Sequence, residues 1–304
     1  MKILVVFTIL FLVASAHTDE SWKHGYKTTF FDSFIGAGGS LPSSSNWLID
    51  LGTSYPGGAA NWGTAEVETC TSHRSNLAIT KKNTLAIVPR LSRHGNWTSA
   101  RIETVRTDFV CSEGGKLFIE AKIRLGNASE SQMQGIWPAF WALGSKFRGN
   151  YTNWPMVSEW DFLESINGLP RMYTTVHCGY APGGPCNEYS GIGSHTNFTK
   201  GEWHKVGFEV DRSMNGEWGN GTWLNETLRW KLDDQLVFTV SGAMVGDEQA
   251  WMELAHEPHF ILLNVAVGGS FPNGIAGMPT PTNATIGGKN VGMEVDYVGV
   301  WNSH

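Results

Sequence analysis

Short alternating or continuous apolar runs recur along the chain, and clusters of glycine, proline, asparagine and serine separate them. No long window shows apolar residues at the i, i+3, i+4, i+7 spacing of an amphipathic helix. Runs of this length between turn residues predict β-strands. A helix is predicted only near Asp247–Leu254. The predicted strands span Leu77–Thr80, Leu85–Val88, Ala100–Val105, Lys116–Leu125, Val206–Val210, Leu236–Val240, His259–Ala266 and Met293–Trp301.

Many short strands with turn signals between them predict an all-β fold, either a sandwich or a barrel. The chain has 304 residues, of which 41% are hydrophobic, so it can bury a large core. All-β domains often exceed roughly 200 residues. No internal repeat or low-complexity linker divides the sequence. We therefore expect a single domain over residues 17–304.

The N-terminus has the pattern of a secretory signal peptide. An apolar run from Ile3 to Ala14 follows Lys2, and Ser15 and Ala16 then complete a small-residue cleavage site. A membrane anchor is the alternative, but the run is shorter than the roughly 20 residues that span a bilayer. We expect residues 1–16 to be removed and the mature protein to be soluble and secreted.

The net charge of the chain indicates which classes of binding partner are unfavourable. A formal net charge of −6 argues against binding to nucleic acid or to a membrane surface, because both partners call for a basic face. We expect a monomer with neither kind of partner.

If the protein is secreted, its cysteines can form disulfides and its Asn-x-Ser/Thr sequons can be glycosylated. The chain has four cysteines, which in an oxidising compartment form disulfides rather than buried free thiols. Of the three pairings we expect Cys178–Cys186, which closes a short loop, together with Cys70–Cys111. Seven Asn-x-Ser/Thr sequons are typical of a eukaryotic secreted glycoprotein, and they begin at Asn96, Asn127, Asn150, Asn197, Asn220, Asn225 and Asn283.

Three carboxylates lie close together between large apolar side chains. On a strand, Glu159 and Asp161 share one face, but Glu164 is out of phase. A one-residue bulge near Phe162 and Leu163 would return Glu164 to that face. The apolar residues between the acids require a buried opposite face, which argues against an acidic edge strand exposed to solvent.

This spacing indicates a chemistry. Two glutamates whose carboxyl groups come within about 5 Å of each other are the machinery of a retaining glycosidase. Three carboxylates on one face do not all ionise without cost. We expect an ionised Glu159 as nucleophile, Glu164 with a raised pKa as general acid and base, and Asp161 as an assistant to Glu159.

The motif Glu-x-Asp-x-x-Glu, preceded by Gly135-Ile-Trp-Pro-Ala-Phe-Trp-Ala-Leu-Gly144, resembles glycoside hydrolase family 16. The resemblance covers nearly the whole mature chain and implies a β-jelly-roll sandwich of the concanavalin A type, with a cleft across its concave sheet. The loop from Cys178 to Cys186 is similar to one in fungal secreted members. Four other segments match the family in order: Ser99-Ala-Arg101-Ile-Glu103-Thr, Gly115-Lys-Leu-Phe-Ile-Glu-Ala-Lys122, Asn264-Val-Ala-Val-Gly-Gly269 and Glu294-Val-Asp296-Tyr-Val-Gly-Val-Trp301.

The resemblance implies the same three catalytic roles and an aromatic cleft, because flat indole rings pack on the apolar faces of sugars. Core packing is the alternative for each tryptophan, and we expect Trp47 and Trp301 to be structural. We expect His177 to hydrogen-bond Asp161. The implied substrate contacts are Trp137, Trp141, Arg101, Trp160, His177 and Asn264, with Trp62, Glu66 and Trp154 as further candidates.

No cofactor or metal is expected for the chemistry. Relatives often hold a structural calcium near the last strand, for which Asp296 is a candidate ligand. The resemblance implies a secreted endo-hydrolase of β-1,3- or mixed β-1,3(4)-glucan. A β-1,3-galactanase and a cell-wall transglycosylase are alternatives, and the non-enzymatic alternative is a glucan-binding lectin on the same fold.

Overall fold

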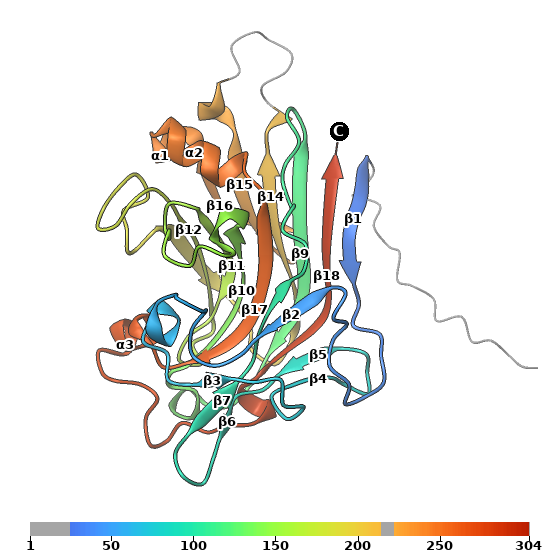
Figure 1. Cartoon of the computed structure of the whole chain (residues 1–304), viewed down its shortest axis with the longest axis vertical. Helices are drawn as coiled ribbons and strands as arrows, with labels where there is room; N and C mark the ends of the chain where they lie inside the picture. Colours follow the sequence, from blue (N-terminus) through green and yellow to red (C-terminus); the bar gives the residue numbers. More distant parts are fainter. Residues whose placement is uncertain (1–24, 214–221, 304) are drawn as a thin grey trace, which may run out of the picture.

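The computed structural model describes residues 25–213 and 222–303, and most of its elements are antiparallel strands (Figure 1). The larger of two main sheets has eight strands, and it pairs the first strand with the last. In spatial order it comprises β16 (Gln235–Ser241), β15 (Thr227–Leu232), β14 (Trp203–Asp211), β9 (Lys116–Leu125), β18 (Met293–Ser303), β5 (Leu85–Ile87) and β4 (Leu77–Ile79), with β1 (Tyr26–Asp32) beside β18.

The second main sheet has seven strands and carries the acidic motif on β11. In spatial order it comprises β13 (Ile192–Asn197), β12 (Arg171–His177), β11 (Glu159–Glu164), β10 (Ile136–Gly144), β17 (His259–Val267), β8 (Arg101–Thr104) and β2 (Trp47–Asp50). A small third sheet comprises β3 (Thr69–Cys70), β7 (Trp97–Ser99) and β6 (Arg90–Leu91).

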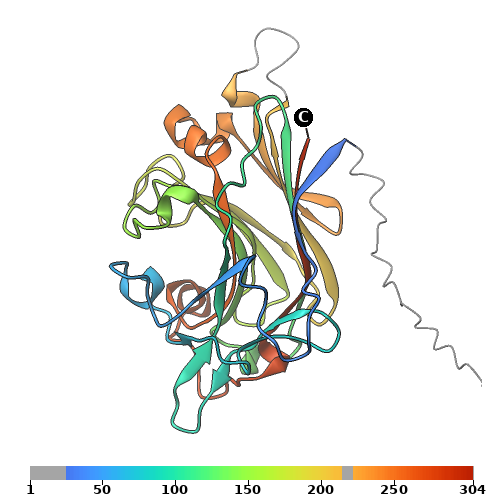
Figure 2. The ribbon, with the colours of Figure 1, turned by 45° about the vertical axis from the view of Figure 1, so that its right-hand side comes forward.

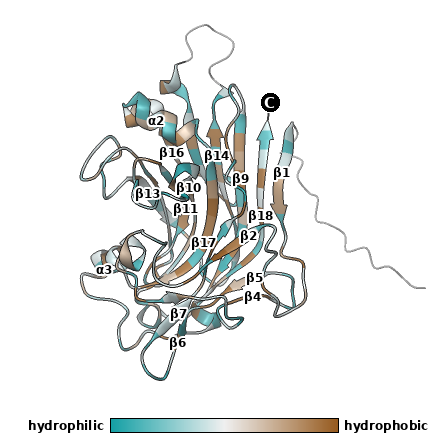
Figure 3. Cartoon of the chain, in the orientation of Figure 1, coloured by the Kyte–Doolittle hydropathy of each residue, from teal (hydrophilic) through white to brown (hydrophobic). Residues whose placement is uncertain are grey.

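The two main sheets pack face to face, and apolar side chains fill the space between them. Trp160 and Phe162 of β11 each have their ring centroid 4.9 Å from that of Phe208 on β14, in the opposite sheet. The central strand β17 is rich in apolar residues, and all nine of its residues are buried (Figure 3). This is a β-jelly-roll sandwich, so the predicted all-β fold is confirmed.

All eight predicted strand segments overlap observed strands, and β9 has the predicted bounds. The predicted helix is α2 (Glu248–Ala255), which begins where the Asp247 carboxylate accepts a hydrogen bond from the backbone N–H of Ala250. Two short helices were not predicted: α1 (Gly242–Val245) and α3 (Ser270–Ala276). Figure 2 shows α1 and α2 toward one end of the sandwich and α3 toward the other. Single 3-10 turns span Ala60–Gly63, Glu130–Gln132, Ser145–Phe147, Trp223–Asn225 and Lys289–Val291.

The cysteines follow the prediction only in part. Cys178 and Cys186 form a disulfide, as predicted. The predicted pairing of Cys70 with Cys111 is wrong, because both are buried free thiols. Cys70 lies on β3 in the small sheet, whereas the Sγ atom of Cys111 contacts the carbonyl of Val210 on β14. Burial raises the pKa of both thiols, that of Cys111 to about 12, which keeps them protonated.

Two predictions fall on residues outside the described ranges, namely the signal peptide at 1–16 and the sequon at Asn220. The asparagines of the six other sequons are all exposed, as a glycan requires. Among the described residues, no helix has the length and apolar character needed to cross a membrane. Trp47 and Trp301 are buried, as expected for structural residues.

Candidate active site

The acidic motif is brought to one face of β11 by a β-bulge. Against β10, Leu163 pairs with Phe140 and Asp161 pairs with Trp141, so Phe162 is the extra residue. Phe162 and Leu163 are both fully buried in the core. Burying side chains of this size contributes roughly 1.5–3 kcal/mol each, so the core itself holds the bulge in place. The predicted bulge is confirmed.

The outer face of the seven-stranded sheet, here called the site face, is the one that carries Glu159, Asp161 and Glu164. Strand register extends a row of side chains from Glu164 across this face. Asp161 is 3% exposed, and Glu159 and Glu164 are half-buried. The row at the level of Glu164 comprises Tyr173, Glu164, Ala139, Asn264, Arg101 and Asp50.

Each of the two glutamates is held by an indole. The Nε1–H of Trp154 donates to Oε2 of Glu159 over 3.0 Å. The Nε1–H of Trp137 donates to Oε1 of Glu164 over 2.8 Å. Trp137 and Trp154 therefore lie at the acids, and each fixes a carboxyl group through its indole N–H.

Burial and mutual repulsion dominate the electrostatics of the acids. Burial and the charge of Asp161 raise the pKa of Glu164 to about 8, against the hydrogen bond from Trp137. Burial and the same charge raise the pKa of Glu159 well above its ordinary range, against the effect of His177. The sequence predicts a raised pKa for Glu164 alone. The structure raises the pKa of both glutamates, because burial and the charge of Asp161 disfavour their ionisation.

His177, on β12 opposite Glu159, lies beside the acids as predicted. Its Nε2 atom is 3.4 Å from Oδ2 of Asp161 and 4.0 Å from Oε1 of Glu159. On its other side, Nδ1 is 2.8 Å from Oε2 of Glu188. Although burial opposes it, the nearby carboxylates of Asp161, Glu188 and Glu159 raise the pKa of His177 well above its ordinary value.

Arg101 organises a second part of the site face. Its guanidinium carbon is 4.7 Å from the ring centroids of both Trp62 and Trp141, and 5.3 Å from that of Tyr55. Its Nε atom is 3.3 Å from Oδ2 of Asp50. A guanidinium stacked between rings holds them in fixed orientations. The predicted residues Arg101, Trp62 and Trp141 thus form one cluster.

Asn264 and Glu66 lie close to this cluster and to the acids. Oδ1 of Asn264 accepts a hydrogen bond of 2.7 Å from Nε1 of Trp141. Oε1 of Glu66 accepts one of 2.6 Å from the hydroxyl of Thr64, and the charge of Glu66 helps to raise the pKa of Glu164. The structure therefore brings these two predicted residues to the site as well.

Trp160 is the exception among the predicted substrate contacts. It is 1% exposed, and its Nε1–H donates to the carbonyl of Leu254. The ring stacks on His259 inside the sandwich, with centroids 3.5 Å apart. Side chains alternate along a strand, so a residue between Glu159 and Asp161 must point into the core. The prediction that Trp160 contacts substrate is wrong.

Two places carry carboxylates that could bear on metal binding. The donor atoms of Glu159, Asp161 and His177 lie within 4.8 Å of one another, and this is the one such group among the described residues. At the last strand, the carboxylate of Asp296 is paired with Nζ of Lys122 at 2.9 Å. A lone carboxylate already neutralised by a lysine does not fit a calcium site, which needs six to eight oxygen ligands.

Sequence reasoning missed several polar residues of the site. Tyr55 donates its hydroxyl proton toward Glu103 and Asp50, with oxygen distances of 2.9 and 3.2 Å. Glu188 comes from the loop closed by the disulfide. Both Tyr55 and Glu188 lie in loops far from the motif in sequence. A signal existed only for Glu188, which is two residues from Cys186.

Paired glutamates on one face of a sheet are the kind of acid pair that glycoside hydrolases use. No protein-family profile matches the chain. The crystal structure of an endo-1,3-β-glucanase from Streptomyces sioyaensis is 44% identical in sequence and covers 95% of this chain and 99% of its own, with a TM-score of 0.87. The chain belongs to glycoside hydrolase family 16 and is an enzyme, and the lectin alternative is wrong.

The chain is also similar to two more distant proteins. The curated glucan endo-1,3-β-glucosidase A1 of Niallia circulans is 26% identical over an alignment of 283 residues that covers 86% of this chain. The matched part is 36% of that relative, so the chain spans about a third of its length. SCLam, a non-specific endo-β-1,3(4)-glucanase from family GH16, is 20% identical and covers 92% of each chain; its TM-score of 0.66 shows the same fold.

Proposed function

We propose that the protein is a secreted, retaining endo-glucanase that hydrolyses β-1,3- or mixed β-1,3(4)-glucan. The observation that carries this proposal is the bulge at Phe162, which places Glu159 and Glu164 on one face of one strand. The names of the relatives support the substrate class, because the Streptomyces enzyme is an endo-1,3-β-glucanase. The disulfide and the exposed sequons support secretion.

The mechanism has two displacements. In the first, a carboxylate oxygen of Glu159 attacks the anomeric carbon, and the bond from this carbon to the leaving sugar oxygen breaks while Glu164 protonates that oxygen. In the second, ionised Glu164 takes a proton from water, and the water oxygen attacks the anomeric carbon and releases Glu159. The β-configuration is retained, and no cofactor enters either step.

The neighbours of the acids would prepare them for these roles. Glu159 must lose its proton when substrate binds, and protonated His177, 4.0 Å from it, favours the carboxylate. Glu164 must hold its proton, and its pKa of about 8 keeps it protonated at neutral pH. We propose that the glucan lies across the site face, with sugar rings against Trp137, Trp141, Trp154 and Trp62.

A substrate screen tests this function. We expect release of reducing sugar from laminarin and from mixed-linkage barley glucan or lichenan, but not from β-1,3-galactan. Proton NMR of the earliest products is expected to show the β-anomer. Cleavage of the galactan alone would establish the galactanase alternative, and longer products without net reducing sugar would indicate a transglycosylase. An α-anomer would mean an inverting mechanism.

Asp161 is expected to assist rather than to react. Its Oδ2 atom faces His177, and it lies between the glutamates on the site face. Asp161→Asn removes a charge but keeps the shape, so we expect kcat to fall by roughly 10- to 100-fold, less than for either glutamate. The comparison comes from kcat on laminarin for the three variants Glu159→Gln, Asp161→Asn and Glu164→Gln. A loss for Asp161→Asn equal to that for Glu159→Gln would revise this role.

A further inference from the structure

A buried carboxylate outside the acidic motif lies directly behind His177. Glu188 is 5% exposed. One of its carboxylate oxygens, Oε2, is 2.8 Å from Nδ1 of His177. The other, Oε1, accepts a hydrogen bond of 2.8 Å from the backbone N–H of Cys178. Both oxygens are therefore engaged, one by the imidazole and one by the backbone of the next residue.

This arrangement determines which side of the imidazole faces the acids. Because Nδ1 faces a carboxylate, it carries a proton, and Nε2 points toward Asp161 and Glu159. The ring of Trp154 lies 5.4 Å from the imidazole between centroids and limits its rotation. A row of polar groups thus runs from Glu188 through His177 toward Asp161 and Glu159.

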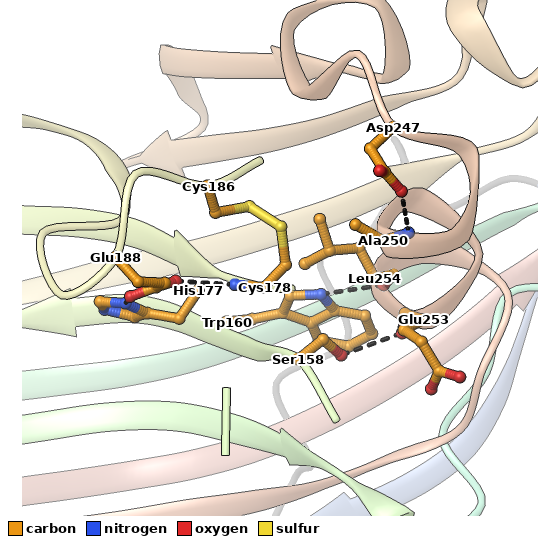
Figure 4. The surroundings of a disulfide bond; sticks show 10 residues. All are labelled: Ser158, Trp160, His177, Cys178, Cys186, Glu188, Asp247, Ala250, Glu253 and Leu254. Atoms are coloured by element: carbon orange, nitrogen blue, oxygen red, sulfur yellow. Dashed lines mark hydrogen bonds and ion pairs between the residues drawn. A yellow bond between two sulfur atoms is a disulfide. The ribbon is translucent and has the colours of Figure 1, made fainter. Parts of the chain in front are cut away.

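The disulfide lies close to both His177 and Glu188 in the sequence. Cys178 directly follows His177, and Cys186 is two residues before Glu188 (Figure 4). A backbone bridge between Gly183 and Glu188 closes the same loop a second time. Figure 4 shows the His177 ring lying against the Glu188 carboxylate beside the disulfide. The loop therefore has few ways to move Glu188 away from the imidazole.

We propose that Glu188 is a positioning residue of the glycosidase reaction, which keeps His177 charged and oriented beside Glu159 and Asp161 while the Cys178–Cys186 disulfide holds the Glu188 carboxylate in place. This inference rests on the proposed function, because Glu159 and Glu164 are the groups on which His177 acts. Glu188 does not touch the reacting atoms itself.

The charges around His177 determine in which direction the pKa values of the site change when the Glu188 charge is removed. The groups that face it are Glu159 and Asp161 from β11 and Glu188 from the loop, with Glu164 further along β11. The positive charge of His177 lowers the pKa of both glutamates of the motif. Without the Glu188 charge, the pKa of His177 falls, the imidazole becomes neutral at lower pH, and the pKa values of Glu159 and Glu164 rise further.

Glu188→Gln tests this proposal. The amide keeps the size of the side chain but presents a donor to Nδ1, which disfavours the imidazolium. We expect both limbs of the pH profile of kcat/KM on laminarin to move upward by about one pH unit, the effect of one close charge. At pH 6 we expect kcat to fall roughly tenfold, with a smaller change in KM. The matched control is Glu202→Gln, an exposed glutamate before β14, which should leave the profile unchanged.

A second measurement does not depend on activity. NMR titration of the His177 imidazole should give a lower pKa in Glu188→Gln than in the wild type, and a wild-type-like value in Glu188→Asp, which keeps the charge. The double variant Cys178→Ala/Cys186→Ala should shift the profile in the same direction as Glu188→Gln. If Glu188→Gln fails to fold, the pH profile of kcat/KM and the His177 titration of Glu188→Asp and of the double variant test the role of Glu188 instead.

The outcomes separate the two proposals. An unshifted pH profile together with an unshifted His177 titration would overturn the role of Glu188, even if kcat fell. If the wild-type protein failed to cleave any β-glucan, the proposed function would fail, while the titration would still show whether Glu188 controls His177.

Discussion

Glu159→Gln is expected to lower kcat on laminarin by roughly 10,000-fold or more, because an amide cannot form the covalent glycosyl intermediate. The amide oxygen can still accept the hydrogen bond from Trp154, so the fold should be retained. Reducing-sugar kinetics measure the loss, and thermal unfolding followed by circular dichroism confirms that the variant is folded.

The control for Glu159→Gln is again Glu202→Gln, which removes one carboxylate at an exposed position. We expect wild-type kcat for this control. If Glu159→Gln retained more than a tenth of the wild-type rate, another group would have to be the nucleophile.

Glu164→Gln is expected to lower kcat on laminarin by roughly 100- to 10,000-fold, the range for loss of a general acid and base. A β-glucoside with an activated aryl leaving group needs little protonation, so its first cleavage step should be much less affected. Because the pKa of Glu164 is about 8, wild-type activity on laminarin should fall as the pH rises above 8. Equal losses on both substrates would argue against Glu164 as the acid.

The same substitution should stabilise the protein at alkaline pH. Burial raises the pKa of Glu164 from 4.5 to about 8, so between these values the folded state holds a proton that the unfolded state has lost. Stability therefore decreases as the pH rises through this window, and Glu164→Gln removes that decrease. We expect its melting temperature to exceed that of the wild type by roughly 3–8 °C at pH 8 and by less at pH 5.

The sequence pattern predicted those features that depend on residues close together in the chain. The odd spacing of Glu159 and Glu164, with apolar residues between them, predicted the bulge at Phe162, because the core demands those side chains. The helix predicted near Asp247–Leu254 is α2, whose first turn is capped locally by the Asp247 carboxylate. The short Cys178–Cys186 loop likewise required only nearby chain.

The errors concern contacts between distant segments. Strand alternation places Trp160 in the core, but a family-derived assignment of tryptophans to the substrate ignored that phase. The pairing of Cys70 with Cys111 depended on how β3 packs relative to the segment before β9, and the number of cysteines does not determine that packing. Tyr55 reaches Glu103 from a loop without any motif, and Glu188 acts through a ring that only the folded chain brings near it.

The central claim is that Glu159 and Glu164 act on one glycosidic bond from one face of β11, with Glu159 forming the covalent bond. Incubation of the enzyme with a 2-deoxy-2-fluoro β-laminaribiosyl fluoride, followed by proteolysis and mass spectrometry, tests it most directly. We predict one added 2-deoxy-2-fluoro-laminaribiosyl group on the peptide that contains β11, with fluoride released and the ester on Glu159. An ester on Asp161 or Glu164, or turnover of the compound without any adduct, would contradict the account.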